Sequence, residues 1–343
     1  MSAPPRRDGP AGRIQADPPS LIEHVADAFG LGQVDTWAVL TTGYEDCNID
    51  LRTTPTVTAA APSAPDRVVV KVFATGRREL ATRTCEIITR VRAAGVRHPR
   101  LRLDRTGVAV HEHAGHQLLV MDYVPANSFY DLRRAPDASE LAAVVQQAAL
   151  IHTVAMTPVF VHDPWAITNL EAMLHRVADV LDGEQHRLVD AAATALAGVD
   201  RMVLPTVLNH GDLTKGNVLV DEHATVHVLD FAVANRLPRV QELAVIAANL
   251  THGDPTPLPE RVETIADLYC AAAATPLSAV EREALRRFGH AAAAMELLGA
   301  LDQWQHGNRG PETEYLIELG MAGLRDIPAP SAAVPACLSD VDS

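Results

Sequence analysis

Alternating apolar and polar residues mark the first third of the chain as mainly β-structure. In the segment 67–73, valines at every second position share one face of a predicted strand, and Lys71 lies between two apolar residues on the other face. Residues 35–52 predict a hairpin whose polar turn contains Gly43, and two more strands are predicted on either side of the turn 114–116. Apolar residues at helical spacing predict one helix in this region, over residues 78–94.

From Ser139 onward the apolar residues recur at helical spacing instead, in five successive segments. Residues 208–231 interrupt these helices with an isolated β pattern, in which valines alternate before and after the polar turn 221–224. The order predicts an α+β protein with a small β-rich lobe followed by a larger, mainly helical lobe. A cleft between two lobes is a common place for a ligand.

The lobes are expected over residues 19–123 and 124–326. Residues 1–18, which are rich in proline, glycine and arginine, and the tail 327–343 are expected to be disordered. The segment from Thr53 to Asp66 consists largely of proline, alanine and threonine, and it is predicted to be a linker between two strands.

Composition narrows the function classes. The 343 residues carry a formal net charge of −14, which disfavours a nucleic-acid partner. The four cysteines lie far apart without metal or disulfide spacing, as is typical of reduced thiols. No stretch approaches the length of a membrane span, and no apolar segment follows the two early arginines as in a signal peptide. A cytoplasmic protein without a membrane partner is expected, and the oligomeric state stays open.

The stretch LNHGDLTKGNVLVDEHATVHVLDF, from Leu208 to Phe231, carries the candidate chemistry. It places Asp212 and Asn217 close together and brings Asp230 back to them after a strand-turn-strand pattern. In phosphoryl transfer a protein mainly positions groups and neutralises charge. One carboxylate can take the proton of an acceptor hydroxyl, while an amide and a second carboxylate supply oxygen ligands for Mg²⁺. Each acid alone is compatible with a solvated turn, but the combination favours a site.

Several motifs together resemble one family. HGDLTKGNVLV is similar to the catalytic loop of the aminoglycoside phosphotransferase and choline kinase family of protein-kinase-like small-molecule kinases, and VHVLDF to its metal-binding strand. VVVKVF resembles the ATP-lysine strand, LLVMDYVPANSFYDL the hinge between lobes, and PRVQELAVIAANL the helix after the metal-binding aspartate. The likeness covers about residues 20–325. It implies a two-lobed kinase-like fold and an ATP- and Mg²⁺-dependent enzyme that phosphorylates a hydroxyl of a small molecule.

The resemblance assigns roles to the matching residues. Asp212 is implied to be the catalytic carboxylate that orients and deprotonates the acceptor hydroxyl. Asn217 and Asp230 are implied to hold Mg²⁺, and Lys71 to pair with the α- and β-phosphates of ATP. His210, grouped with the catalytic residues, is expected to brace the catalytic loop by hydrogen bonding.

The remaining nucleotide contacts are also implied by the resemblance. The helix 78–94 is expected to offer a glutamate to the ATP-binding lysine, with Glu86 as the first choice and Glu79, on the same side, as the second. Backbone groups of Asp122 and Val124 are expected to meet adenine. The nucleotide loop, TTGYEDCNIDL, has a single glycine, Gly43.

The acceptor is less defined. GYEDCN is similar to the corresponding loop of hydroxylysine kinases, which implies an amino alcohol or hydroxy amino acid, and an antibiotic such as an aminoglycoside is the other possibility. Glu296 and Asp302 beside Trp304 could bind an ammonium group, although a solvated helix surface is the simpler interpretation. Lys215 could approach the transferred phosphoryl group or be a surface lysine.

Two other classes of protein compete with this interpretation. A catalytically silent kinase-fold binding protein is suggested by the single glycine of the loop and by FAVANRLP after Asp230, which lacks a second acid. A protein kinase is disfavoured because PRVQELA follows Asp230 after too few residues for a long activation loop. HEHAGH is not a zinc motif, since Gly115 stands where HExxH needs histidine and the segment predicts a hairpin.

Overall fold

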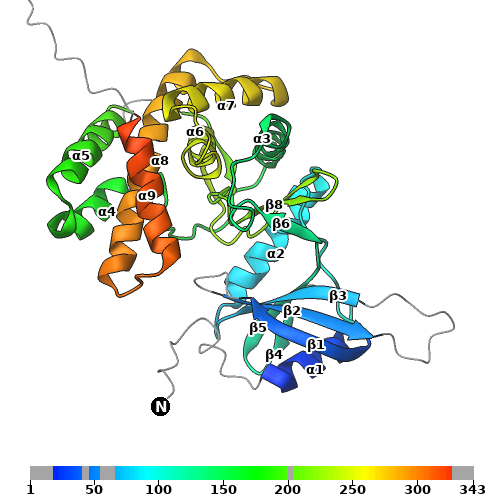
Figure 1. Cartoon of the computed structure of the whole chain (residues 1–343). Helices are drawn as coiled ribbons and strands as arrows, with labels where there is room; N and C mark the ends of the chain where they lie inside the picture. Colours follow the sequence, from blue (N-terminus) through cyan, green and yellow to red (C-terminus); the bar gives the residue numbers. More distant parts are fainter. Residues whose placement is uncertain (1–17, 41–45, 55–65, 200–203, 327–343) are drawn as a thin grey trace, which may run out of the picture.

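The computed structural model describes residues 18–40, 46–54, 66–199 and 204–326. Within them a β-sheet part and a larger helical part follow each other along the chain, and α2 lies between the sheet and the helical part (Figure 1). Gly43, most of the Thr53–Asp66 segment, and nearly all of both terminal segments expected to be disordered lie outside the described residues.

The first part is an antiparallel five-stranded sheet with the order β1-β2-β3-β5-β4. Its strands are β1 (Gln33–Leu40), β2 (Cys47–Thr54), β3 (Asp66–Phe73), β4 (His111–His113) and β5 (His116–Asp122). His113 pairs with His116 across the turn between β4 and β5, so HEHAGH is a hairpin as predicted. In the described ranges, no group of three or more acids, cysteines and histidines is placed to hold a metal ion.

Two helices cover the two faces of this sheet. The valines at 68, 70 and 72 of β3 pack in one core with the buried face of α1 (Pro18–Ala28). On the opposite face, Phe73 packs with Ala81 of α2 (Arg78–Ala93). The alternation and α2 agree with the prediction, but α1 does not, because only one helix is predicted from the sequence in this region. Its buried Leu21, Ile22 and Val25 do follow helical spacing.

The second part is mainly helical and surrounds one large apolar core. Its helices are α3 (Ala138–His152), α4 (Leu170–Val177), α5 (Gly183–Ala197), α6 (Arg239–Val245), α7 (Leu258–Ala272), α8 (Ala279–Gln305) and α9 (Pro311–Arg325). Its strands are β6 (Ala126–Ser128), β7 (Thr206–Asn209), β8 (Val218–Asp221), β9 (Val226–Val228) and β10 (Asn235–Pro238). Among the described helices, none combines the length and apolar character needed to cross a bilayer.

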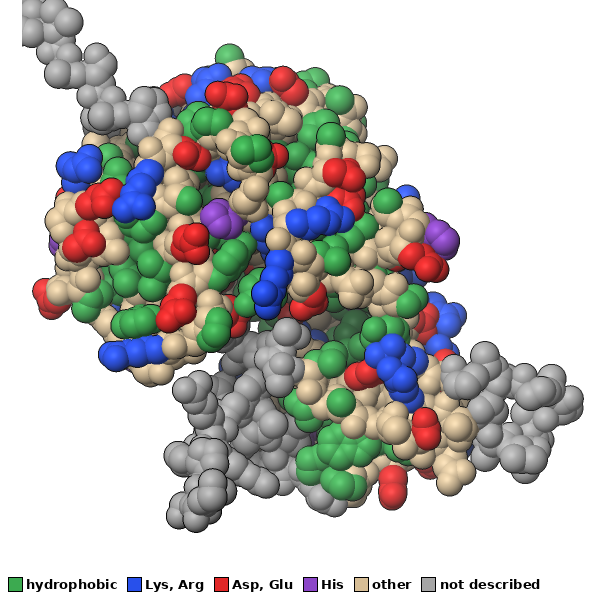
Figure 2. All heavy atoms as spheres, in the orientation of Figure 1, with side chains coloured by type: hydrophobic (Ala, Val, Ile, Leu, Met, Phe, Trp, Pro, Cys, Tyr) green, Lys and Arg blue, Asp and Glu red, His purple; other side chains and the backbone are tan. Residues whose placement is uncertain are grey.

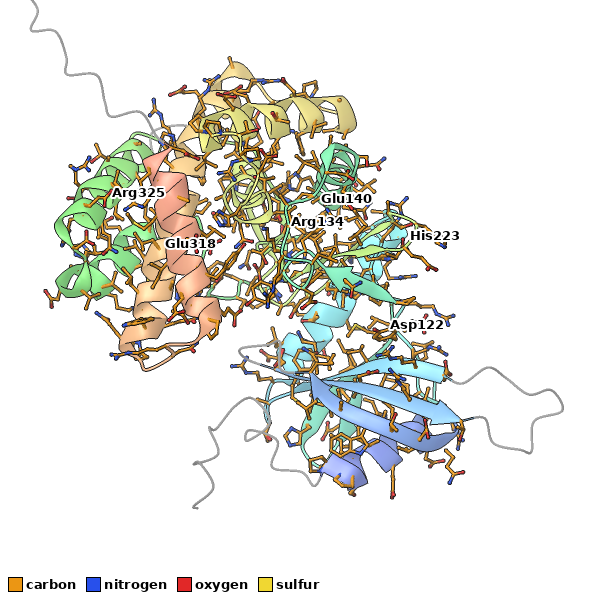
Figure 3. The ribbon with its side chains drawn as sticks, in the orientation of Figure 1. Asp122, Arg134, Glu140, His223, Glu318 and Arg325 are labelled. Atoms are coloured by element: carbon orange, nitrogen blue, oxygen red, sulfur yellow. The ribbon has the colours of Figure 1, made fainter. Side chains whose placement is uncertain are left out.

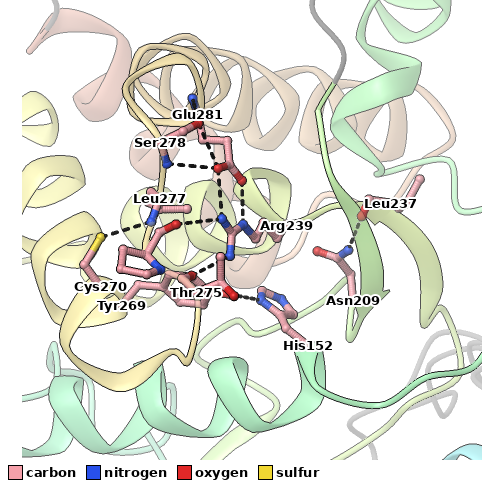
Figure 4. Close-up of polar contacts among 11 residues, drawn as sticks. His152, Asn209, Leu237, Arg239, Tyr269, Cys270, Thr275, Leu277, Ser278 and Glu281 are labelled. Carbon is pink, nitrogen blue, oxygen red and sulfur yellow. Dashed lines mark hydrogen bonds and ion pairs between the residues drawn. The ribbon is translucent and has the colours of Figure 1, made fainter.

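A buried ion pair fixes the start of α6 against the start of α8 (Figure 4). The guanidinium of Arg239 donates to the carboxylate of Glu281, with an Nη2–Oε2 distance of 2.9 Å, and to the carbonyl oxygens of Thr275 and Pro276. Glu281 also completes the capping box of α8 with Ser278. Since α6 directly follows the candidate metal-binding segment, this pair helps to set the position of the site.

Acidic and basic side chains are interspersed on the face of the molecule drawn in Figure 2. Many of them form ion pairs, such as Arg325 with Glu184, whose Nη2–Oε2 distance is 2.9 Å. Exposed pairs of this kind contribute little to stability. The fold is therefore held mainly by its apolar cores, and the site must be sought where charges are buried.

Candidate active site

A cleft of about 2540 Å³ runs between the sheet part and the helical part. This volume exceeds the several hundred Å³ typical of a single small-ligand pocket, so the cleft has room for two reactants. Most residues singled out in the sequence line it: Lys71, Glu86, Asp122, Val124, Asp212, Asn217 and Asp230. The cleft thus collects side chains that lie as far as 159 positions apart in the chain.

The catalytic loop connects β7 to β8, and its second residue must be glycine. Gly211 has φ +89°, and a Cβ on it would lie 3.1 Å from the carbonyl oxygen of Val233. Only glycine adopts this conformation without strain. The sharp turn brings the loop against the segment that follows Asp230. Asp230 itself has a φ of 59°, which bends the chain after the β8–β9 hairpin.

His210 braces this loop. Its ring is fully buried and packs on Phe231, with ring centroids 4.5 Å apart. Nε2 lies 2.7 Å from the carbonyl oxygen of Leu229, and Nδ1 accepts a hydrogen bond from the backbone N–H of Asp212 at 3.1 Å. Burial lowers the pKa of His210 to about 4, so the neutral ring donates from Nε2 and accepts at Nδ1. The bracing role expected from the sequence agrees with this geometry, and the ring itself is closed off from the cleft.

Asp212 and Asn217 are in direct contact. The Asn217 side-chain nitrogen donates to Oδ2 of Asp212 at 2.6 Å and to its backbone oxygen at 3.1 Å. Burial, and then the negative charge of Asp163, raise the pKa of Asp212 to about 6. A carboxylate of that pKa is ionised at neutral pH and is a stronger base than an ordinary aspartate, as general base catalysis requires.

Asp230 and Lys71 meet across the cleft. Lys71 Nζ lies 2.8 Å from Oδ1 of Asp230 and 3.3 Å from Oδ2 of Asp46. Burial opposes the charge of Asp230, but the ammonium of Lys71 holds the pKa of this carboxyl below its usual range. The ionised lysine and aspartate therefore lie at the same point of the cleft, where a nucleotide phosphate and a cation could be bound together.

The expected ion pair between Lys71 and Glu86 is not what the structure contains. The side chain of Glu86 is 53% exposed and pairs with Arg90, one turn further along α2. Glu79, the second choice, is also on the exposed side of the helix. The physical reason is the rotation of α2, which turns Ala81 and its neighbours toward the sheet and both glutamates toward solvent.

Two residues near this point were missed in the sequence. Asp46, which directly precedes β2, is the second carboxylate on Lys71. Arg83, which is buried on α2, donates to the backbone carbonyls of Val159, Ala232 and Ala234. A buried arginine at an inward position of an amphipathic helix could have been noticed from its spacing to Ile87, whereas the partner of Lys71 could not.

The hinge lies where β5 leaves the sheet, near Asp122 (Figure 3). The side chain of Asp122 forms ion pairs with Arg100 and Arg102, and its backbone N–H donates to the carbonyl of Arg100 at 3.0 Å. A contact from Asp122 to adenine would therefore have to come from its carbonyl oxygen. Val124 also lines the cleft.

The end of the cleft beyond Asp212 is acidic and aromatic. Its lining includes Asp163, Trp165, Glu296, Glu312 and Tyr315. Burial raises the pKa of Glu296 to about 7. Lys215 also lines this end, but its Nζ donates to the carbonyl of His252 at 2.6 Å, and burial lowers its pKa to about 8. Asp302 forms an ion pair with Arg176 instead and is not part of this lining.

Glu242 on α6 contacts the backbone of the catalytic loop. No sequence motif indicates this role. Its Oε2 accepts a hydrogen bond from the backbone N–H of Gly211 at 3.0 Å, and the residue is 1% exposed. Burial raises the pKa of Glu242 to about 7, although the bonds from the loop N–H groups act in the opposite direction.

We expect Glu242→Gln to alter the pH dependence of stability. The pKa of Glu242 is raised in the folded state, so the protein loses stability as pH rises from about 4.5 to about 7. The loss is of the order of about 3 kcal/mol for this group. Glutamine can still accept from Gly211 and has no charge to bury. Melting temperatures at pH 5 and pH 8 test this prediction. The melting temperature of Glu242→Gln, relative to that of the unmodified protein, should be higher at pH 8 than at pH 5. The same difference in melting temperature at both pH values would contradict the prediction.

The sequence matches the model of the phosphotransferase enzyme family over residues 56–279. Because this match spans well over half of the chain, the chain belongs to the phosphotransferase enzyme family. The resemblance is confirmed at the level of this family, and the enzyme class is that of a phosphotransferase. A comparison with curated protein sequences finds no significant match.

Solved structures share the fold at low identity. A spectinomycin phosphotransferase in complex with ADP and spectinomycin has a TM-score of 0.62 and 11% identity, covering 91% of this chain and 100% of that chain. A choline/ethanolamine kinase family protein from Mesorhizobium loti has a TM-score of 0.63 and 14% identity, with 91% and 95% covered. A choline kinase from Streptococcus pneumoniae has a TM-score of 0.58 and 13% identity, with 90% and 99% covered. The predicted kinase-like α+β fold is confirmed.

Proposed function

We propose that this phosphotransferase moves the γ-phosphoryl group of ATP, in the presence of Mg²⁺, to a hydroxyl of a small molecule that carries a positive charge. The observation that carries the proposal is the grouping of Lys71, Asp212, Asn217 and Asp230 along one cleft. Asp212 contacts Asn217 at 2.6 Å, and Lys71 contacts Asp230 at 2.8 Å. Positioning and charge neutralisation are what phosphoryl transfer demands of a protein.

The residues fit Mg²⁺ by their chemistry. Asp230 provides a carboxylate and Asn217 an amide oxygen, and hard cations prefer oxygen ligands. Asp230 keeps its charge because Lys71 lowers its pKa. Mg²⁺ bound at these oxygens would supply positive charge against the transferred phosphoryl group.

Asp212 acts on the acceptor. Its carboxylate accepts the hydroxyl proton while the bond from that oxygen to the γ-phosphorus forms and the bond to the β–γ bridging oxygen breaks, so that ADP leaves. Asn217 holds one oxygen of Asp212, which fixes the direction of the other. His210 keeps the loop in place through Leu229 and the backbone of Asp212.

On the nucleotide side, Lys71 supplies a charge for the α- and β-phosphates. The carbonyl of Asp122 and the N–H of Val124 are suited to adenine, since both residues line the cleft at the hinge. The nucleotides in related structures, such as the ADP of the spectinomycin phosphotransferase, agree with this assignment.

The acceptor is proposed to be an amine-bearing alcohol. The far end of the cleft carries the carboxylates of Asp163, Glu296 and Glu312, with the rings of Trp165 and Tyr315 beside them. The amine of Lys215 is engaged with His252. Acidic and aromatic groups together suit a cation, which agrees with both an aminoglycoside-like antibiotic and an amino alcohol or hydroxy amino acid.

The test is Mg²⁺-dependent ADP release by the purified protein with a panel of acceptors. The panel contains aminoglycosides, spectinomycin, choline, ethanolamine, homoserine and hydroxylysine, together with uncharged polyols. Release that requires an amine-bearing acceptor supports the proposal, and a preference for polyols refutes the charge requirement. Binding of Mg-ATP without turnover on any acceptor would favour the catalytically silent binding protein.

The pH dependence of kcat/KM for the acceptor provides a further prediction. Asp212 must be ionised to accept a proton, so the rate should fall as pH drops through the pKa of this group, which is about 6 in the free protein. This fall in rate is the acid limb of the pH profile. Bound Mg²⁺ adds positive charge and moves the acid limb to lower pH. The limb is therefore expected at or below pH 6.

Asp163→Asn serves as the matched variant for this profile. The charge of Asp163 contributes to the raised pKa of Asp212, so its removal should shift the acid limb to lower pH. The position of the limb is measured, and not the rate at one pH, because Asp163 also lines the acceptor end of the cleft. An unchanged limb in this variant would mean that another group sets the profile.

A further inference from the structure

We propose that Asp46 positions Lys71 for the nucleotide phosphates, in place of a glutamate from helix α2. This inference rests on the proposed nucleotide binding and adds a residue that the sequence motifs do not indicate. It also predicts that neither glutamate of α2 contributes to nucleotide affinity.

The orientation of α2 excludes its own acids. The helix packs on the sheet face that carries Lys71, because Phe73 of that face contacts Ala81. Its buried positions are Ala81, Arg83, Thr84, Ile87, Ile88 and Val91. Glu79 and Glu86 lie on the exposed side, and Glu86 already pairs with Arg90 at 3.0 Å.

Strand register places Asp46 beside Lys71 instead. In the antiparallel pair of β2 and β3, Asn48 lies opposite Lys71. Side chains two residues apart in an extended segment point to the same side, so Asp46 shares the side of Asn48 and of the lysine. Its Oδ2 lies 3.3 Å from Lys71 Nζ.

The pair is buried, which makes it more than a surface contact. Asp46 is 6% exposed and Lys71 is 5% exposed. The other oxygen of Asp46 has no hydrogen-bond partner among the described residues, so Lys71 is the main compensation for this charge. Removal of Lys71 would leave the charge of Asp46 buried without its main compensation, whereas Lys71 keeps Asp230 when Asp46 is removed.

The roles of Asp46 and Asp230 would differ when nucleotide and metal occupy the cleft. Lys71 now has two carboxylate partners, Asp230 and Asp46. If Asp230 turns to a metal ion, Asp46 is the partner that stays with the lysine amine. Asp46 would then hold Lys71 Nζ at the position in the cleft where the nucleotide phosphates bind. Arg83 holds α2 against the segment after Asp230 by hydrogen bonds to the backbone carbonyls of Ala232 and Ala234.

The experiment measures Mg-ATP affinity by calorimetry for the intact protein, for Asp46→Asn, and for Glu86→Gln, which tests the competing glutamate of α2. Asp267→Asn, at an exposed ion pair with Arg282 that does not line the cleft, is the matched control. Asp46→Asn keeps the side-chain shape and should weaken Mg-ATP binding by about tenfold. Asp267→Asn, the same change at an exposed position outside the cleft, should leave it within about twofold. Glu86→Gln should weaken it less than Asp46→Asn does. A larger effect for Glu86→Gln than for Asp46→Asn would overturn the proposal.

A double-mutant cycle with Lys71→Met separates positioning from a structural effect. If Asp46 acts through the lysine, Asp46→Asn should change the affinity of the Lys71→Met protein by less than about twofold. Additive losses would refute the inference. Thermal unfolding gives a second readout. The double variant is expected to melt above Lys71→Met, in which Asp46 is buried without the lysine, and additive losses of melting temperature would count against the pair.

The outcomes also distinguish this inference from the proposed function. If the intact protein does not bind Mg-ATP, the proposed function fails and the inference falls with it. If the intact protein binds Mg-ATP and Asp46→Asn binds equally well, only the inference is wrong.

Discussion

Asp212→Ala is expected to lower turnover by about three orders of magnitude, within the range found for loss of a general base. The carboxylate is the group placed to take the acceptor proton, and its raised pKa makes it suited to that task. Affinity for Mg-ATP should change little, since the side chain contacts Asn217 and not Lys71. Steady-state turnover and calorimetry on the same preparation separate the two effects.

The stability of the variants provides the control for this prediction. Burial raises the pKa of Asp212, so the ionised group is unfavourable in the folded protein at neutral pH. Asp212→Asn removes that charge and should not lower the melting temperature. A loss of turnover accompanied by unfolding would instead indicate a structural role. Asp267→Asn, at an exposed residue paired with Arg282 on the surface, should leave turnover unchanged.

The features that could be predicted from the sequence are those that local patterns determine. The alternation in β3 assigns its two faces correctly, and the apolar spacing of α2 places that helix within one residue of its observed end at Ala93. The spacing of Asp212, Asn217 and Asp230 describes a loop and a hairpin that bring three side chains to one point. Each of these predictions involves residues less than 20 positions apart or a single element.

The partner of Lys71 depends on the relation between elements, and the sequence does not state it. The position of Glu86 along α2 is suitable for a contact with Lys71, but the rotation of this helix on the sheet turns the Glu86 side chain to solvent. A signal was available: Glu79, Glu86 and Arg90 share a side with two threonines, whereas the apolar stripe lies opposite. Asp46 could be found only from the register of β2 on β3, which hydrogen bonds between strands decide.

Buried polar residues were also overlooked because their burial is a tertiary property. Glu242 is one acid in the helix-forming run PRVQELA, and only the structure shows that it accepts from Gly211. Arg83 looks like an ordinary helical arginine until its guanidinium is seen among backbone carbonyls. Charged residues are rarely fully buried without partners, so both positions are best explained by the loops they hold.

Asp230→Ala is expected to weaken Mg-ATP binding by about 100-fold or more, because it removes the proposed metal ligand at the point where the phosphates would lie. The same change takes from Lys71 the partner at 2.8 Å and leaves Asp46 at 3.3 Å. Asp46 can still compensate the lysine, so the protein should fold, with a lower melting temperature. Turnover should fall at least as far as affinity, since both metal and nucleotide are affected.

The dependence on Mg²⁺ distinguishes a metal ligand from a residue that only neutralises Lys71. Affinity for ATP is measured by calorimetry at several Mg²⁺ concentrations and in the presence of a chelator. With a metal-binding Asp230, the intact protein and Asp230→Ala should differ strongly at high Mg²⁺ and much less without it. A difference that stays constant across the series would assign the effect to the ion pair with Lys71. Asp221→Asn, at a carboxylate that accepts from the turn between β8 and β9, controls for damage to the hairpin that presents Asp230.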